Sequence, residues 1–545
     1  MQNNDASRKK TALISVYDKK GIVEFTNELV ALNYTIISSG GTAKVLKEAG
    51  IDVIDVTDFT GLAPMLDHRV ATLHPKIYGG LLAMDTPEHR AELLKADYEW
   101  IDLVCVDFYP LEQEIASPTS TPDSVRKLTD IGGPTMVRAG GKGLRISICD
   151  AADRPKVIEW LKEGSPDHEK FVTGLAAKAE FVVARYCLTS AQYLSGGNFV
   201  GVFGKKDKEL RYGENAYQTP AYLVNGFSEY PLAIHNFKMH IGNPSMINFT
   251  DVDRALTTML HLAAGFDTNF HNVPHMAVGV KHGNACGASV GDSKEEAIIR
   301  MLKGNLRSIF GGTVLLNFEI DKDVADILVM GETTNGRRRP LDVVVGSSVT
   351  DEAIEVLKRQ NDRCLVLTNP ALTALSKESL DETLERRQLA GGDWIEQPKH
   401  NFVIDLSSKE DSAHYGKIQT EETINRDTVL AWAVCSTSNS NTITLAKDGM
   451  IIGNGVGQQD RVEAAELAIK RARDMDHVIE GAVAVSDSFF PFPDAPQKLL
   501  DAGVARILST SGSINDKLTI ALFENSSTAE LVQIPDKVGR MFFGH

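Results

Sequence analysis

The chain has 545 residues, of which 43% are hydrophobic and 24% are charged, and it contains no low-complexity tract. This length and composition predict roughly three or four folded units with buried cores, and they exclude a disordered or fibrous chain. The formal net charge of -16 excludes a nonspecific grip on nucleic acid, because such binding needs dense Lys and Arg to displace counterions.

The sequence favours neither membrane insertion nor metal binding. No apolar run reaches the roughly 18 residues that a spanning helix needs, and residues 1–10 are polar and lack the core of a signal peptide. The six cysteines stand singly, without a CxxC pair or a His/Cys spacing that suits zinc. We therefore expect a cytoplasmic protein with reduced thiols that requires no metal and binds neither membrane nor nucleic acid.

Short apolar runs alternate with helical patterns in the first 150 residues. The runs lie at 12–16, 35–37, 53–56, 103–108 and 145–149, and helices are expected from about residues 20 and 42. This alternation predicts a first α/β domain, residues 1–150, built on a doubly wound parallel sheet. The ligand site of such a sheet lies where loops leave the carboxyl ends of the strands.

The rest of the chain is expected to form a connector and a second α/β domain. Residues 170–190 carry apolar residues at helical spacing, which predicts a helical connector over residues 151–200. Further strands are expected at 276–280, 343–345 and 483–485, and a helix at 463–473. The second domain, residues 201–545, is expected to consist of two similar halves with a boundary near residue 375.

Three polar loops of the first domain suit an anion such as a phosphate. Residues 39–42, Ser-Gly-Gly-Thr, lead from a strand into a helix and so expose backbone N–H groups at a helix N-terminus. Residues 69–76 concentrate donors, and residues 130–135, with Arg138 and Lys142, add a carboxylate and cations. Each loop alone is also typical of an ordinary solvated loop, but the three together favour an anion pocket.

Five stretches of this domain resemble the IMP cyclohydrolase domain of the bifunctional purine-biosynthesis enzymes: residues 15–19, 39–42, 72–75, 108–110 and 130–133. The resemblance implies a methylglyoxal-synthase-like fold. It also implies that the nucleotide is held by Ser15, Lys19, Ser39, Gly40, Gly41, Thr42, Arg69, Thr72 and Gly132. The residues that it implies in ring closure are Tyr109, Asp130 and Lys142.

Two loops depart from the pattern of this family. The family reads Arg-Val-Lys-Thr-Leu-His-Pro where this chain has Ala71 in place of the lysine, with His68 in place of a glycine nearby, and residues 138–143 also differ. The missing ammonium would stabilise negative charge as the carboxamide nitrogen attacks the formyl carbon, and losing one such donor costs on the order of 100-fold in rate. Ring closure is intramolecular, so proximity preserves part of the rate. We expect a weakened cyclohydrolase.

The sharpest cluster of the second domain is Lys281 and His282, which follow an apolar strand and precede a glycine. At the end of a strand, two neighbouring side chains can reach one pocket. A buried histidine alone is more often structural, but an adjacent lysine without an acidic neighbour in sequence favours chemistry. A neutral imidazole can take a proton from an amine while an ammonium stabilises a tetrahedral oxyanion.

From about residue 205 to its end, the chain resembles the transformylase domain that formylates aminoimidazole carboxamide ribonucleotide (AICAR). The segments that carry this resemblance lie at 210–215, 247–248, 280–287, 310–312, 342, 440–441, 457–461, 486–494 and 511–513. The resemblance implies 10-formyltetrahydrofolate as cosubstrate, transfer of its formyl group to the amine of AICAR to give FAICAR, and closure of FAICAR to IMP. It also implies a homodimer, and two halves with a cytidine-deaminase-like fold that lack the zinc ligands of that fold.

The same resemblance implies a role for each matched residue. Lys281 and His282 carry the chemistry and Asn441 orients them. The ribonucleotide is bound by Arg211, Tyr212, Asn248, Asp342 and Arg461. The folate side is lined by Phe489, Phe492, Asp494 and Ser513, and the family's C-terminal Arg and His correspond to Arg540 and His545. Two positions depart from the family: Tyr217 replaces a histidine and Pro493 replaces an arginine.

Three alternatives stay open at this point. The chain can be a monofunctional transformylase whose first domain only binds nucleotide, and Ala71 is the residue that raises this alternative. A noncatalytic nucleotide sensor is a second, although it has no need of Lys281, His282 and Asn441. A methylglyoxal-synthase-like lyase fits the first domain in isolation, but not a chain with a matching second domain.

Overall fold

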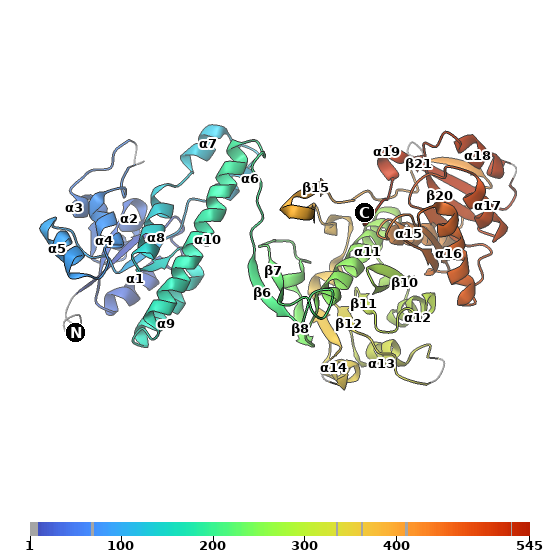
Figure 1. Cartoon of the computed structure of the whole chain (residues 1–545), viewed down its shortest axis with the longest axis horizontal. Helices are drawn as coiled ribbons and strands as arrows, with labels where there is room; N and C mark the ends of the chain where they lie inside the picture. The colour runs from blue at the N-terminus through green and yellow to red at the C-terminus, as the bar shows by residue number, and fades with distance from the viewer. Residues whose placement is uncertain (1–8, 67–69, 334–335, 361–362, 409–411, 525) are drawn as a thin grey trace. The chain divides into compact units, whose positions relative to one another are not determined.

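The computed structural model describes residues 9–66, 70–333, 336–360, 363–408, 412–524 and 526–545. The chain divides into two compact units, Met1–Phe203 and Gly204–His545 (Figure 1). Among the helices of the described residues, none combines the length and the apolar character that crossing a membrane requires.

Unit 1 is built on a five-stranded sheet in the order β3-β2-β1-β4-β5, and every neighbouring pair is parallel. The predicted doubly wound parallel sheet is therefore confirmed. Its strands are β1 (Lys10–Ser15), β2 (Tyr34–Ser38), β3 (Val53–Asp55), β4 (Leu103–Val106) and β5 (Ile146–Ile148). The strand order reverses between β1 and β4, which is where ligands of such sheets bind.

Helices cover both faces of this sheet because successive strand residues point to opposite sides. Ala12 and Ile14 enter one core, and Leu13 enters the other. The helices of unit 1 are α1 (Ile22–Ala31), α2 (Gly40–Glu48), α3 (Val56–Thr60), α4 (Pro75–Leu82), α5 (Pro87–Lys95), α6 (Leu111–Ala116), α7 (Pro122–Lys127), α8 (Gly132–Lys142), α9 (Arg154–Lys162) and α10 (His168–Leu194). Helix α10 packs on α8 and β5, and its apolar residues enter both cores.

Unit 2 contains a twelve-stranded mixed sheet in the order β16-β21-β20-β19-β17-β18-β10-β9-β11-β12-β13-β8. Its strands are β8 (Lys238–Ile241), β9 (His275–Lys281), β10 (Asn284–Gly291), β11 (Thr313–Leu316), β12 (Val343–Gly346), β13 (Leu365–Thr368), β16 (Ala413–Gly416), β17 (Ile443–Lys447), β18 (Met450–Gly455), β19 (Val483–Ser486), β20 (Arg506–Ser511) and β21 (Glu530–Pro535). Two separate hairpins pair β6 (Lys205–Leu210) with β7 (Ala221–Asn225), and β14 (Leu384–Gln388) with β15 (Trp394–Pro398).

The twelve strands form two halves with the same pairing pattern. In the first half, β9 pairs antiparallel with β10 and with β11, and β11-β12-β13 are parallel. In the second half, β17 pairs antiparallel with β18 and with β19, and β19-β20-β21 are parallel. The halves join through the antiparallel pair of β10 with β18. The α/β class is confirmed, and the second half repeats the topology of the first.

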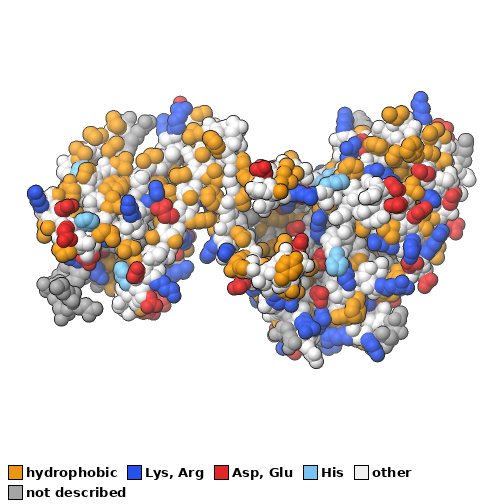
Figure 2. Space-filling model, in the orientation of Figure 1, with side chains coloured by type: hydrophobic (Ala, Val, Ile, Leu, Met, Phe, Trp, Pro, Cys, Tyr) orange, Lys and Arg blue, Asp and Glu red, His pale blue; other side chains and the backbone are white. Residues whose placement is uncertain are grey.

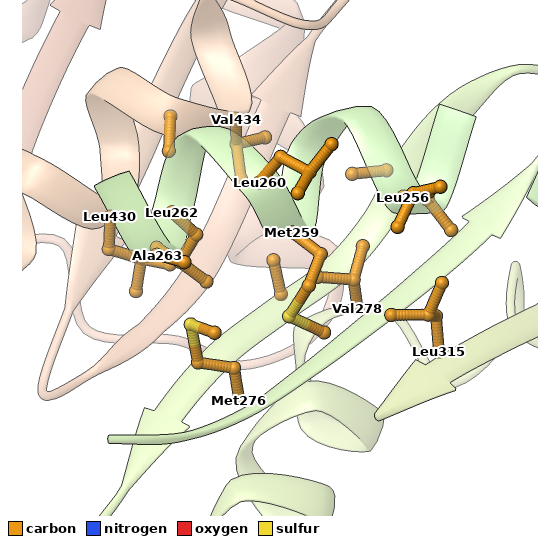
Figure 3. Packing of buried hydrophobic residues seen from close by; sticks show 14 of the residues in the cluster. Leu256, Met259, Leu260, Leu262, Ala263, Met276, Val278, Leu315, Leu430 and Val434 are labelled. Atoms are coloured by element: carbon orange, nitrogen blue, oxygen red, sulfur yellow. The ribbon is translucent and has the colours of Figure 1, made fainter. Parts of the chain in front are cut away.

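Helices cover both faces of this sheet as well. They are α11 (Met246–Phe270), α12 (Lys294–Gly304), α13 (Lys322–Met330), α14 (Asp351–Leu357), α15 (Glu422–Cys435), α16 (Arg461–Asp474), α17 (Asp494–Asp501), α18 (Asp516–Glu524) and α19 (Asp536–Gly539). Figure 3 shows Met259 of α11 above Met276 and Val278 of β9, with Leu430 and Val434 of α15 beside that helix. Helices α12 to α14 and α16 to α18 bury their apolar residues in two further cores.

Glycines in β18 allow α16 to approach the sheet closely. A Cβ atom on Gly453 would lie 2.3 Å from the carbonyl oxygen of Ala468, which belongs to α16. A side chain at position 453 would therefore force the backbone of α16 and of β18 apart, because a main-chain oxygen cannot rotate out of the way as a side chain can.

We predict that Gly453→Ala lowers the free energy of unfolding of unit 2 by about 1–3 kcal/mol, because it overpacks this contact. Thermal unfolding followed by calorimetry measures the change. Gly174→Ala is the control: this exposed glycine lies within α10, and a Cβ atom added to it would meet open space. That substitution should stabilise unit 1 by about 0.5–1 kcal/mol, since alanine is the better helix former.

Candidate active sites

The candidate site of unit 1 begins at the carboxyl ends of β1 and β2. The hydroxyls of Ser15 and Ser39 lie 3.2 Å apart. The Thr42 hydroxyl donates to the Val16 carbonyl over 3.0 Å and accepts from the Val16 N–H over 3.2 Å, so it ties α2 to the loop after β1. Helix α2 begins at Gly40, whose φ of 51° favours glycine, and its first N–H groups have no intrahelical partner. This end of α2 suits an anion.

Asp107 holds the loop after β1 in place. It directly follows β4, and its carboxylate accepts hydrogen bonds from the N–H groups of Tyr17 and Asp18. It also pairs with Arg154 over 3.5 Å. The Lys19 ammonium donates to the carbonyls of Val16 and Tyr17 within this loop. Burial lowers the pKa of Lys19 and raises that of Asp107.

The N-terminal end of α8 completes this site. The Asp130 carboxylate accepts from the Gly133 N–H over 2.9 Å, and the Thr72 hydroxyl lies so close to Gly132 that a Cβ there would be 2.6 Å away. Burial raises the pKa of Asp130. Burial, and then the neighbouring Asp130 charge, raise the pKa of Tyr109. The structure therefore brings Tyr109, Asp130, Thr72 and Gly132 together.

One predicted residue of this site lies elsewhere, and another lies outside the described residues. Lys142 is exposed at the last position of the 11-residue helix α8, about 15 Å along the axis from Gly132. The structure therefore does not bring it to Tyr109 and Asp130. Arg69 and the neighbouring His68 lie outside the described residues. Ala71 is half-buried beside Thr72.

The candidate site of unit 2 centres on the turn between β9 and β10. Lys281 pairs with Asn284 across the two strands, so His282 and Gly283 form a two-residue turn. Both have positive φ, 52° and 74°, as the favoured type I′ hairpin turn requires. The Lys281 ammonium donates to the Phe310 carbonyl over 2.6 Å. His282 is exposed at the tip of the hairpin.

Asn441 lies at the same edge of the sheet as this turn. The side chain of Asn284 accepts from the Asn439 N–H over 3.0 Å, a bond that links segments 155 positions apart. Asn441 and Gln458 exchange two backbone hydrogen bonds of 3.1 Å, and the Asn441 amide donates to Gln459. The structure thus brings the Lys281–His282 turn and the Asn441 loop together.

Arg461 and the C-terminal segment adjoin this loop. Arg461 pairs over 3.1 Å with Asp487, which is fully buried and also accepts from the Ser440 hydroxyl. The Phe542 ring lies near the guanidinium groups of Arg461 and Arg540, and contacts the ring of His545. These predicted residues form one cluster.

The other four residues predicted to hold the ribonucleotide lie around the first turns of α11. The Arg211 guanidinium lies 5.2 Å from the ring centre of Tyr212, whose carbonyl accepts from the N–H of Met246. Asn248 accepts from the Ser245 N–H in a capping box. Asp342 is close enough to Asp251 to contribute to its raised pKa, although burial contributes most. Tyr217, which replaces the family's histidine, is 82% exposed.

The residues predicted for the folate side follow β19 and β20. Phe489 and Phe492 follow β19, Asp494 is the first residue of α17, and Ser513 follows β20. The Asn515 amide donates to the Pro491 carbonyl over 2.8 Å and joins the two loops. Phe492 is 59% exposed, whereas Phe490 of the same run is buried in the core.

Three residues around the His282 turn were not predicted from the sequence. Asp251 of α11 accepts from the Gly283 N–H over 2.8 Å, and Asn284 links the turn to Asn439. The Arg254 guanidinium lies 4.2 Å from the ring centre of Phe543, and its Nη1 is buried without a hydrogen-bond partner among the described residues. No local motif marks their roles; of the three, only Asn284 lies in a segment that resembles the family.

The surface carries charges of both signs. Figure 2 shows Lys and Arg interspersed with Asp and Glu over the visible face of each unit. Among the described residues, no cluster of three or more His, Cys, Asp or Glu side chains is arranged as metal ligands.

Comparisons with known proteins match both units. A family model described as AICARFT/IMPCHase bienzyme matches residues 145–471, and an MGS-like domain model matches residues 21–135. The bifunctional purine biosynthesis protein PurH of Anoxybacillus flavithermus is 37% identical over 94% of this chain and 96% of its own length. The protein of the same name from Thermoanaerobacter sp. is 35% identical over 94% of this chain and 96% of its own length. The one from Bacillus cereus is 34% identical over 96% of this chain and 98% of its own length.

We predict that Tyr186→Phe destabilises unit 1. The Tyr186 hydroxyl accepts from the Asp130 N–H over 2.8 Å and donates to the Leu128 carbonyl, so its loss leaves both groups unpaired. The expected cost is about 1–3 kcal/mol, measured by denaturant unfolding. Tyr193→Phe on the same helix is the control, since no hydrogen bond of its hydroxyl is found among the described residues, and an equal loss there would contradict the prediction.

Proposed function

This chain belongs to the AICARFT/IMPCHase bienzyme family, and we propose that it formylates AICAR and then closes FAICAR to IMP, the two reactions of purine biosynthesis for which that family is named. Close relatives named as bifunctional match nearly the full length of the chain, which favours this function over a monofunctional transformylase. The meeting of His282, Lys281 and Asn441 at one sheet edge carries the assignment of formyl transfer to unit 2.

We assign the proton transfer of the first reaction to His282. The AICAR amine nitrogen attacks the formyl carbon of 10-formyltetrahydrofolate, and the neutral imidazole takes the amine proton. Lys281 stabilises the tetrahedral oxyanion. The bond from the formyl carbon to the folate nitrogen then breaks, that nitrogen takes a proton, and FAICAR and tetrahydrofolate leave. Asn441 orients the reacting groups.

We assign the second reaction to the strand-end site of unit 1. The carboxamide nitrogen of FAICAR attacks the formyl carbon, and water is lost as the ring closes. The end of α2 and the hydroxyls of Ser15 and Ser39 bind the phosphate, while the Thr42 hydroxyl, already bonded to Val16, holds α2 in place. Tyr109 and Asp130 lie together at the end of α8 and assist ring closure. The placement of Lys142 gives its proposed role no support.

Further expectations rest on the composition of the sequence or on the family resemblance. A homodimer, a cytoplasmic location and the absence of a metal requirement stay predictions. So do the substrate contacts of Arg211, Tyr212, Asn248, Asp342, Arg461, Phe489, Phe492, Asp494, Ser513, Arg540 and His545.

Product analysis tests the two activities together. The protein is incubated with AICAR and 10-formyltetrahydrofolate, and the products are separated by chromatography. IMP as the end product supports both activities. FAICAR accumulating without IMP would refute the cyclohydrolase, and neither product would refute the whole proposal.

We predict that His282→Asn abolishes formyl transfer, with kcat reduced by at least about 100-fold, since a general base contributes on the order of 10²–10⁴. Asparagine tolerates the left-handed backbone, and Asn-Gly is a preferred type I′ pair, so the turn is preserved. Steady-state kinetics measures the loss, with His477→Ala, a half-buried histidine after α16, as control. Undiminished transfer by His282→Asn would refute the assignment.

We predict that Ala71→Lys increases the rate of IMP formation from FAICAR, by on the order of 10- to 100-fold, because it restores a cation beside the attacked carbonyl. Formyl transfer by the same variant serves as the internal control and should not change. Equal cyclisation rates for the two proteins would show that the chain does not lack this ammonium.

A further inference from the structure

The turn that carries His282 occurs twice in unit 2. Lys447 and Met450 pair across β17 and β18, so Asp448 and Gly449 form a two-residue turn like that of His282 and Gly283. All four turn residues have positive φ, 52° and 74° in the first turn and 54° and 75° in the second. Both turns read Lys-X-Gly, with the lysine at the end of a strand.

Each turn is held by a carboxylate from the preceding long helix. Asp427 of α15 accepts from the N–H groups of Asp448 and Gly449 over 2.9 and 2.7 Å. Asp251 of α11 accepts from the Gly283 N–H over 2.8 Å, and also from the His282 N–H. Asp251 and Asp427 stand at the same position, five residues after the first residue of their helices, and both are buried.

The two lysines also make the same contact. The Lys281 ammonium donates to the Phe310 carbonyl over 2.6 Å, before β11, and the Lys447 ammonium donates to the Glu480 carbonyl over 2.7 Å, before β19. The two turns therefore share their backbone, their carboxylate clamp and their lysine contact. The first residue of the turn carries an imidazole in the first copy and a carboxylate in the second.

We propose that Asp251 is the positioning residue of formyl transfer: its buried carboxylate clamps the N–H groups of the turn and so fixes where the His282 imidazole points. This inference rests on the proposed role of His282. A non-glycine residue in the left-handed region is disfavoured by contacts of its own Cβ. Without the clamp the turn relaxes toward other conformations, and the imidazole moves with the backbone.

Asn284 adds a second support on the opposite side of the turn. Its side-chain oxygen accepts from the Asn439 N–H, and its amide nitrogen lies 3.3 Å from the His282 carbonyl, to which it donates. Asp251 of α11 thus holds the N–H groups of the turn, and the Asn284 side chain holds its carbonyl and ties it to the Asn439 N–H. In the second turn, Met450 stands where the first has Asn284. A methionine side chain cannot donate a hydrogen bond to the carbonyl of Asp448, the counterpart of His282.

The duplicated turn provides the matched control. Asp251→Ala and Asp427→Ala each remove a buried carboxylate that accepts two backbone hydrogen bonds, so both should lower the melting temperature. Only Asp251→Ala should lower kcat of formyl transfer, by on the order of 10- to 100-fold, since a misplacement of about 1 Å can cost that much. KM for AICAR should stay within about twofold of the unchanged protein, because Asp251 is a positioning group.

Conservative variants keep the test decisive if the alanine variants do not fold. Asp251→Asn retains one oxygen that can accept the Gly283 N–H, so its kcat should lie between those of the unchanged protein and Asp251→Ala. Asp427→Asn should leave kcat unchanged. The inference is overturned if both Asp251 variants keep full kcat, or if the Asp427 variants lose as much kcat as those of Asp251.

His282→Asn, measured in the same series, separates this inference from the proposed function. If His282→Asn is inactive while Asp251 variants keep full activity, the positioning role is wrong and the formyl-transfer assignment stands. If His282→Asn is fully active, the assignment of His282 itself is wrong.

Discussion

The candidate site of unit 2 depends on one strand pairing. β10 and β18 pair antiparallel, with Ser289 opposite Met450, and this pair joins two halves that are separate in sequence. It places the end of the β9–β10 hairpin beside the segment that leads into β17. The bond between Asn284 and Asn439 can form only because the halves meet in this way. Neither half alone contains both His282 and Asn441, the residues to which we assign roles in formyl transfer.

The duplicated topology shows which parts of this site belong to the fold rather than to the chemistry. Both halves build the same left-handed turn on a buried aspartate, and the lysine before each turn donates to an equivalent carbonyl. A fold that already holds a turn rigidly needs only one new side chain at its tip to become reactive. In our proposal that side chain is His282, and the second turn carries Asp448 instead.

The candidate site of unit 1 is positioned in a different way, by the carboxyl ends of parallel strands. Its parallel strands end at one edge, and the reversal of strand order between β1 and β4 leaves room there for a ligand. Asp107 links the two sides of this reversal, because it follows β4 and accepts from the loop after β1. Burial keeps the pKa values of Asp130 and Tyr109 above their usual ranges, which is common where side chains are arranged for proton transfer.

The sequence by itself determined the α/β class and the parallel sheet of unit 1, and it supplied most of the candidate residues of both sites, because hydrophobic periodicity and short motifs are local properties. The sequence did not indicate Asp251, because its carboxylate accepts a hydrogen bond from the N–H of Gly283, which lies 32 positions further along the chain. His282 therefore had no acidic neighbour in the sequence-based interpretation. That interpretation grouped Lys142 with Asp130, although Asp130 precedes the first residue of the 11-residue helix α8 and Lys142 is its last. Tertiary structure decided these points, because contacts between distant segments depend on how strands pair and how helices pack, which no local pattern records.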